Sequence, residues 1–317
     1  MKSTNWKSLS DKNLGLCATL AQVMLAAQNC TPDINGPCLL VASDYSGSHR
    51  GSAYDIYSVL VCDLVHCDAW REARLETRKR FIADGRRMSY KGLHDRQRRR
   101  ALGPFLRAAN LIPGICASLA VSKSASTLFQ SDVSPINPDL TDCLSWDNKL
   151  FERAMRIVHI VSFFIAGLSQ KNQDVFWFSD EDEIAANPQR LALLTKMWAN
   201  VISNYPVHSL RHLKCGTTRS DDGSNEIEDF AAIPDLVAGA LSDLLTSIAG
   251  QFRLGLIVPL RLDSKAKATM IGHWLSEQSH SLKRVVLVID TEPHSSKLTV
   301  SRIGFNDLSS IQSVRLS

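Results

Sequence analysis

Three segments with the composition of β-strands follow one another before residue 124, and only after them do strands alternate with helices. These early strands, rich in Val, Ile, Leu and Tyr, are predicted at 38–43, 53–65 and 114–123. The later elements are helices and strands in alternation, predicted at 147–168, 174–180, 183–203, 209–218 and 233–250. Neighbouring strands can pair antiparallel, whereas strands joined through a helix pair in parallel. The chain is therefore expected to form a mixed sheet with helices on its faces.

This order of elements is that of an RNase H-like α/β domain, which is predicted at 38–250. A basic helical insertion at 68–110 interrupts that domain, with helices expected at 69–88 and 94–110. An N-terminal helix and linker (1–37, helix at 5–28) precede it, and an α+β extension (251–317) follows. The extension is expected to contain strands at 255–260, 284–290 and 297–303 and a helix at 264–280. A Ser- and Pro-bearing loop is predicted at 124–142.

The insertion carries most of the positive charge. Residues 71–107 hold thirteen Lys or Arg and four Asp or Glu, although the whole chain has a net charge of only +4. Clustered arginines can hold phosphates through bidentate hydrogen bonds. The alternative is a solvated helix face, with Glu72, Glu76 and Asp95 as partial partners. Because four acids cannot neutralise thirteen bases, we favour a polyanion surface that includes Arg96, Arg99 and Arg100.

The sequence shows neither a secretory signal nor a run of about 20 apolar residues. Its eight cysteines form no Cys-x-x-Cys pair. These features favour a cytoplasmic protein with reduced thiols and no membrane-spanning helix. His208, His212 and Cys215 lack a fourth ligand at zinc-site spacing, so we do not predict a zinc site there.

Several carboxylates stand where predicted strands end. Asp44 ends the first strand, although Asp is also common in turns for its hydrogen bonds to the backbone. Asp180 ends the strand at 174–180 and is followed by three further acids, of which Asp182 is the second candidate. Mutual repulsion among four acids can be relieved by a cation. The alternative is a helix N-terminus, where acids stabilise the helix dipole.

Two further acids lie on predicted helices. Asp235 follows Pro234 in what is expected to be the first turn of an apolar helix, so dipole compensation is again an alternative. A buried acid would need a partner. Glu152 lies on the long apolar helix, where a pair with Arg156 at i+4 explains it at least as well. Asp243 is a weaker candidate two turns after Asp235.

The motifs that contain these acids resemble a widespread uncharacterised bacterial family of predicted RNase H-like nucleases. The similar segments are VASDYSG (41–47), MSYKGL (88–93), FWFSDEDE (176–183) and AIPDLVAGAL (232–241). The resemblance implies Asp44, Asp180 and Asp235 as metal ligands and Lys91 as a phosphate contact. It also implies an association with defence against mobile elements. Ser89 and Tyr90 stand where the family often has Glu before its Lys, so this segment departs from the family pattern.

We therefore expect hydrolysis of phosphodiester bonds in RNA or DNA with Mg²⁺ or Mn²⁺, because two-metal cleavage requires converging carboxylates. The expected ligands are Asp44, Asp180, Asp182 and Asp235, with Glu152 as an additional catalytic candidate. Lys91 and the arginines would position the backbone. The alternatives are an inactive RNase H-like module that binds nucleic acid or protein, and an effector that acts only within a larger complex. The extension at 251–317 could contact a protein partner or a second copy, or could be an ordinary hairpin packed on the core.

Overall fold

The computed structural model describes residues 6–9, 16–125, 128, 146–248, 257–260, 265–277, 281–291 and 298–307. The predicted loop at 124–142 lies almost entirely outside the described residues, as do parts of the predicted N-terminal helix. The strands form one eight-stranded sheet in the order β5-β4-β1-β2-β3-β7-β8-β6. Their bounds are β1 Cys38–Ser46, β2 Tyr54–Asp63, β3 Gly114–Ser122, β4 Asp174–Ser179, β5 Leu213–Thr217, β6 Ile257–Leu260, β7 Leu282–Thr291 and β8 Leu298–Asp307.

The pairing of these strands confirms the predicted connectivity. β1 pairs antiparallel with β2, and β2 pairs antiparallel with β3. β4 lies parallel to β1 and β5 lies parallel to β4, each reached through a helix. The fold is thus a mixed α/β sheet flanked by helices with RNase H-like connectivity. β7 adds to β3 in parallel and forms an antiparallel hairpin with β8, so the C-terminal strands extend this same sheet.

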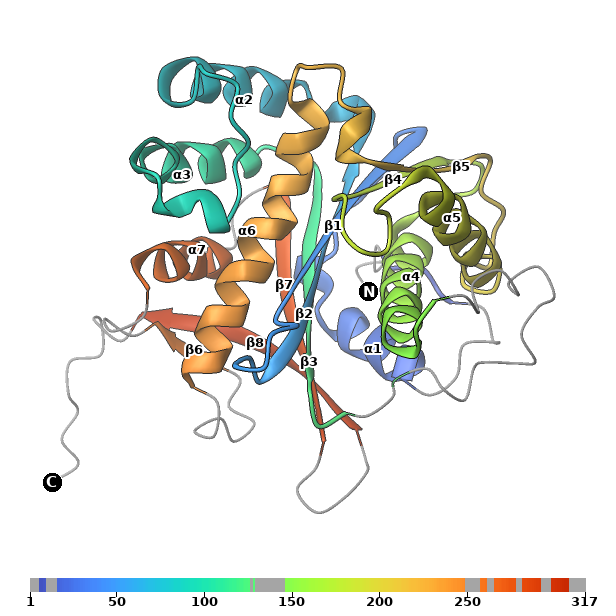
Figure 1. The fold of residues 1–317 in the computed structure, drawn as a ribbon. Coiled ribbons are helices and arrows are strands. Elements are labelled where there is room, and N and C mark those ends of the chain that lie inside the picture. Colours follow the sequence, from blue (N-terminus) through green and yellow to red (C-terminus); the bar gives the residue numbers. More distant parts are fainter. Residues whose placement is uncertain are drawn as a thin grey trace, which may run out of the picture.

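Helices cover both faces of the sheet (Figure 1). One face is packed by α1 (Leu16–Ala26), α4 (Asn148–Leu168) and α5 (Pro188–Ile202). The other is packed by α2 (Asp68–Phe81), α3 (Arg96–Ala109), α6 (Glu226–Ser247) and α7 (Ala266–Ser276). Alternation along β1 divides its side chains between these layers, since Leu39 and Val41 enter the first core and Leu40 and Ala42 the second. Asp44 continues the second set and therefore faces the layer that contains α6.

Two helices begin at different places from those predicted. α5 begins at Pro188, where the Asn187 side chain accepts a hydrogen bond from the Arg190 N–H (2.9 Å). α6 begins at Glu226, seven residues before the predicted start. The Asp221 carboxylate accepts hydrogen bonds from the N–H groups of Asn225 and Ile227 at this end of the helix (2.8 Å each). The prediction that Pro234 opens this helix was wrong, because Pro234 lies in its interior.

α6 is also long and apolar enough to cross a membrane by length and composition alone, although five acids interrupt its apolar residues. In this fold 78% of its most apolar window is buried, mainly against β1 and β2. The apolar side chains of α6 are therefore part of the protein core.

Candidate active site

The parallel pairing of β1 and β4 brings two predicted acids to one level of the sheet. Ser43 is opposite Ser179 in the register of these strands, so the next residues, Asp44 and Asp180, lie side by side. Asp180 follows the end of β4, whereas Asp44 is still within β1 and pairs with Ser58 of β2. The prediction that the first strand ends before Asp44 was wrong, because pairing with β2 continues to Ser46. Parallel strands carry their carboxyl ends to the same edge, where open α/β sheets bind ligands. Asp180 lies between β4 and α5, ahead of the first turn of α5, so stabilisation of that helix dipole does not account for it.

Asp235 approaches the same place from α6, which crosses the face of β1 and β2. The earlier start of α6 puts Asp235 in the middle of the helix, where the dipole alternative also fails. Asp235 and Asp44 line the same space at this edge. Asp235 also accepts a hydrogen bond from the Tyr90 N–H (2.6 Å). Three acids that are far apart in sequence thus meet at one edge of the sheet.

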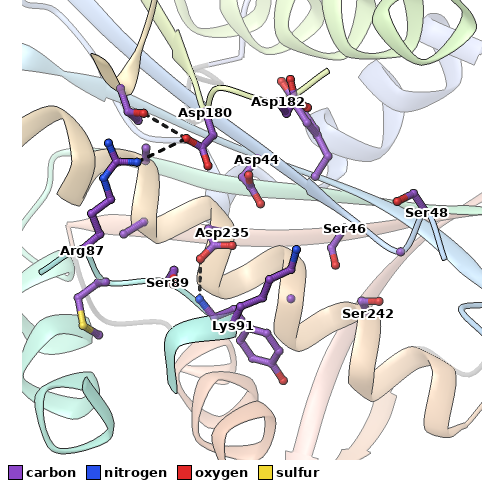
Figure 2. A pocket seen from close by; sticks show the side chains of 18 of the residues that line it. Asp44, Ser46, Ser48, Arg87, Ser89, Lys91, Asp180, Asp182, Asp235 and Ser242 are labelled. Atoms are coloured by element: carbon purple, nitrogen blue, oxygen red, sulfur yellow. Dashed lines mark hydrogen bonds and ion pairs between the residues drawn. The ribbon is translucent and has the colours of Figure 1, made fainter. Parts of the chain in front are cut away.

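A cavity of about 660 Å³ opens at this edge. In Figure 2, Asp44, Asp180, Asp182 and Asp235 lie around one space, with Arg87 and Lys91 beside it. The carboxylates come from β1, from the β4–α5 connection and from α6, whereas Lys91 begins the short 3-10 helix η3 (Lys91–His94). The lining also includes Ser46, Gly47, Ser48, His49, Ser89, Tyr90, Arg153, Thr218, Glu228, Gly239 and Asp243.

Burial and like charge disfavour ionisation of these acids. The pKa of Asp44 is raised well above its usual range by burial and then by the charges of Asp235, Asp180 and Asp182. Burial raises the pKa of Asp235 to about 6, although the Tyr90 N–H and the Lys91 charge oppose the rise. The pKa of Asp182 is raised by burial and lowered by Arg153. A bound cation would offset this repulsion.

The donor chemistry of the cavity suits Mg²⁺ or Mn²⁺, because hard cations prefer carboxylate oxygens. Asp44, Asp180, Asp182 and Asp235 could supply those oxygens. Within the part of the chain that the structure describes, no group of three or more His, Cys, Asp or Glu side chains is arranged to hold a metal ion.

Asp180 and Asp182 also have partners that fix their positions. Thr218 donates to Asp180 (3.1 Å), and the Arg87 guanidinium lies 3.9 Å from the same oxygen. Arg87 is bound more closely to Glu228 (2.6 Å). Arg153 of α4 pairs with Asp182 (3.1 Å). The cavity therefore combines carboxylates with fixed cations at its rim.

Tyr90 connects this cavity to α6 and to α7. Its ring packs on Gly239, its hydroxyl donates to Asp243 (2.5 Å), and Lys267 of α7 donates to its carbonyl oxygen (2.9 Å). The Lys267 ammonium also lies 3.8 Å from the ring centroid. These contacts hold the backbone of Tyr90 on Asp235 and place the adjacent Lys91 at the cavity.

Gly239→Ala is expected to disturb this arrangement, because an added Cβ would lie 2.3 Å from two ring atoms of Tyr90. Overpacking of this kind costs about 1–3 kcal/mol of stability. Displacement of Tyr90 would also weaken any activity that depends on Asp235 and Lys91. Urea denaturation measures the first effect. Gly103→Ala is the matched control, since its Cβ would meet only the end of Arg107 at 3.5 Å. Equal stability of the two variants would contradict the packing argument.

The structure does not bring every predicted residue to this cavity. Glu152 lies on α4 and pairs with Arg156 (2.8 Å), which is the i+4 alternative, and it lines a different cavity. Arg96, Arg99 and Arg100 are exposed on α3 and do not line the acidic cavity. The reason is geometric, because α3 buries its apolar side in the second core, against α2 and α7, and turns these arginines outward.

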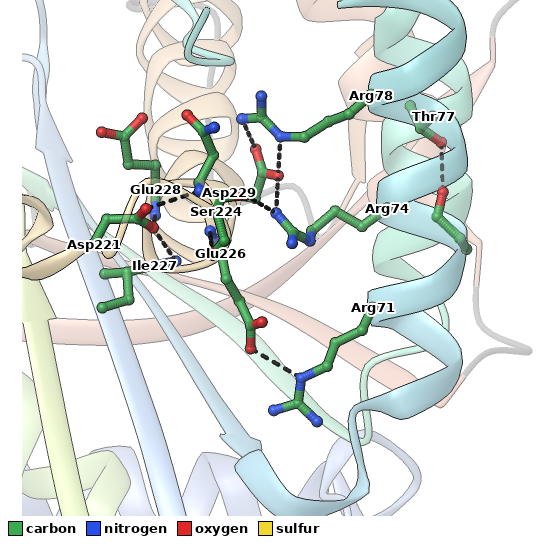
Figure 3. A network of polar contacts seen from close by, with 12 residues as sticks. Arg71, Arg74, Thr77, Arg78, Asp221, Ser224, Glu226, Ile227, Glu228 and Asp229 are labelled. Atoms are coloured by element: carbon green, nitrogen blue, oxygen red, sulfur yellow. Dashed lines mark hydrogen bonds and ion pairs between the residues drawn. The ribbon is translucent and has the colours of Figure 1, made fainter. Parts of the chain in front are cut away.

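Acids elsewhere in the sequence pair with three arginines of the basic insertion, and the count of charges within residues 71–107 did not include these partners. Figure 3 shows arginines of α2 pointing at the start of α6. Arg71 pairs with Glu226 (2.9 Å), while Arg74 (3.0 Å) and Arg78 (2.6 Å) both pair with the fully buried Asp229. These arginines hold the insertion on the domain and are not available to a polyanion.

Comparison with known proteins adds little to this geometry. No protein-family model and no curated protein matches the chain. Among solved structures, the crystal structure of the ribonuclease H2 from Pyrococcus horikoshii OT3 shows a likeness with a TM-score of 0.34 and 10% sequence identity. It covers 75% of this chain and 85% of that chain. The likeness assigns no role to any residue, and the RNase H-like fold described above follows from the connectivity of the sheet.

Proposed function

We propose that this protein is a metal-dependent nuclease that hydrolyses phosphodiester bonds of RNA or DNA. The observation that carries the proposal is the meeting of Asp44, Asp180, Asp182 and Asp235 in one cavity, with Lys91 at its rim. Four clustered carboxylates would not stabilise the binding of a neutral or apolar ligand. They would stabilise the binding of a phosphodiester through divalent cations. The motif resemblance to predicted RNase H-like nucleases supports the same assignment.

The roles of the residues follow from their positions. Divalent cations bound here would supply an activated water and would neutralise charge on the leaving oxygen. Asp44, Asp180 and Asp235 hold and orient those cations, with Asp182 as an additional ligand. Lys91, which lies beside Asp235, contacts a phosphate oxygen of the substrate. Tyr90 fixes both Asp235 and Lys91 through its backbone.

A module that binds nucleic acid or protein without cleaving it is the second candidate. It is favoured by the absence of a preformed three-ligand group among the described residues. Tyr90 in place of the Glu that the resembling family often has points the same way. An effector that is active only inside a larger complex would behave like this module when isolated. The surface of 251–317 is its proposed contact with a partner or a second copy.

The test is cleavage of labelled single- and double-stranded RNA and DNA by the purified full chain with Mg²⁺, with Mn²⁺ and with EDTA. We expect cleavage with either metal and none with EDTA. Salt-sensitive binding without cleavage under all conditions would favour the binding module.

We propose the cytoplasm as the site of action, where Mg²⁺ and nucleic acids are both present. All seven cysteines that the structure describes are free thiols, in keeping with a reducing compartment. A role in defence against mobile elements rests only on the motif resemblance. Protection of cells against phage or plasmid by the wild type, lost in Asp44→Asn, would test that role.

A further inference from the structure

A second cavity, of about 460 Å³, adjoins the acidic one. The two cavities share Tyr45, Ser46, Ser48 and Arg153, so they meet where β1 ends and the turn into β2 begins. Figure 2 shows Ser46 and Ser48 on the side of the acidic cavity away from Arg87. The second cavity then continues over the other face of the β1–β2 hairpin, between that hairpin and α4. Its remaining lining residues are Arg50, Asp55, Ile56, Tyr57, Lys123, Ala125, Lys149, Glu152 and Arg156.

The charge of this second cavity is opposite in sign to that of the first. Five of its lining residues are Lys or Arg and only two are acids. Both acids bind Arg156, since Glu152 lies 2.8 Å and Asp55 lies 3.6 Å from its guanidinium nitrogens. Arg153 pairs with Asp182 (3.1 Å), on the acidic side. These pairings leave the charges of the other three cations uncompensated by the lining acids.

Those three cations are Arg50, Lys123 and Lys149. The Lys123 ammonium donates to the carbonyl oxygen of His49 (2.5 Å), a neutral partner that leaves its charge in place. Arg50 and Lys149 are exposed, and no ion pair to either is found among the described residues. The three come from the β1–β2 turn, the end of β3 and the start of α4, so the fold gathers them from distant parts of the chain.

A nucleic acid bound at the acidic cavity needs such a surface. Bound metal ions can neutralise the phosphate that reacts. The adjacent phosphates of the strand would still be repelled by unshielded carboxylates unless Lys or Arg side chains bind them. The second cavity supplies cations directly where the acidic lining ends. Arg96, Arg99 and Arg100 do not line either cavity.

We propose that the cavity lined by Arg50, Lys123 and Lys149 is a subsite for the phosphate backbone of the nucleic-acid strand that enters the acidic cavity. The proposal rests on the proposed function for the identity of the ligand. The strand runs over the β1–β2 turn and along the start of α4, and not across α3. Recognition through phosphates makes this subsite indifferent to base sequence.

The test compares three double variants in the Asp44→Asn background, so that the oligonucleotide stays intact. Arg50→Ala with Lys149→Ala removes two cations of the subsite. Arg96→Ala with Arg99→Ala removes two cations from the competing path on α3. Lys79→Ala with Lys196→Ala is the matched control, because both lysines are exposed and line neither cavity. Binding of a labelled single-stranded oligonucleotide is measured by fluorescence anisotropy with Mg²⁺ between 50 and about 200 mM salt.

We expect the subsite variant to bind about 10-fold more weakly or worse, with a salt slope smaller by about 1.4. The matched control should differ from its parent by less than about 2-fold. Equal losses in all three variants, a larger loss from the α3 variant, or no binding by the parent would each overturn the subsite. Cleavage is measured separately with Asp44 intact. If the protein does not cleave but the Arg50→Ala and Lys149→Ala double variant binds more weakly, the subsite proposal stands and the proposed nuclease activity is refuted.

Discussion

Asp44→Asn is expected to abolish metal-dependent cleavage while making the metal-free protein more stable. The substitution removes a carboxylate from the centre of the acidic group, and a metal ligand can contribute several kcal/mol to transition-state stabilisation. A loss of about 10³-fold in kcat/KM is therefore expected. Asp44 is also the acid that Asp235, Asp180 and Asp182 repel together. Replacing it with a neutral isostere relieves that repulsion, so thermal stability in EDTA should rise.

The stability gain should depend on pH in a defined direction. The pKa of Asp44 is raised in the folded protein, so its ionisation lowers stability as pH increases above its unfolded value near 3.8. The gain from Asp44→Asn should then be larger at pH 8 than at pH 5. Asp33→Asn is the control, because Asp33 is exposed and lines neither cavity. Lower stability of Asp44→Asn at pH 8 would show that this carboxylate supports the fold.

The strand order could be predicted from the sequence because the apolar runs are uninterrupted. The runs at 38–43 and 114–123 bury nearly every side chain as β1 and β3, and a buried strand has a recognisable composition. The start of α6 could not be predicted in the same way. Its first residues are polar, and the hydrogen bonds from Asp221 that support its start depend on how the preceding loop folds. Pro234 was then mistaken for a start signal.

The sequence predicted which acids form the site. It did not predict the residues that contact those acids. Asp44 and Asp180 could be found because each follows an apolar run, and parallel strands of known order place the residues after such runs together. Tyr90 and Arg153 could not, because their roles depend on contacts across the fold with Asp235 and Asp182. Counting charges within 71–107 missed some ion-pair partners for the same reason. The acids that pair with Arg71, Arg74 and Arg78 lie about 150 residues later in the chain.

Asp229→Ala is expected to have the largest effect on stability. Asp229 is fully buried and accepts hydrogen bonds from Arg74 (3.0 Å) and, through both oxygens, from Arg78 (2.6 and 2.7 Å). Both guanidinium groups are themselves almost completely buried. Removing one partner of a buried charge network leaves uncompensated charge in the core, which costs about 3–5 kcal/mol. Because this network holds α2 on α6, the insertion that carries Tyr90 and Lys91 should loosen as well.

Urea denaturation measures the loss of stability, and limited proteolysis within 68–110 detects detachment of the insertion if the rest stays folded. Glu226→Ala is the matched control. Glu226 of α6 pairs with Arg71, which lies on α2 like Arg74 and Arg78, but both side chains of this pair are 29% exposed. An exposed pair of this kind contributes at most about 1 kcal/mol. Combining Asp229→Leu with Arg74→Met and Arg78→Met should restore part of the stability, since an apolar replacement of the whole network leaves no unpaired charge. If Asp229→Ala cost no more than Glu226→Ala, the buried network would not be what holds the insertion against α6.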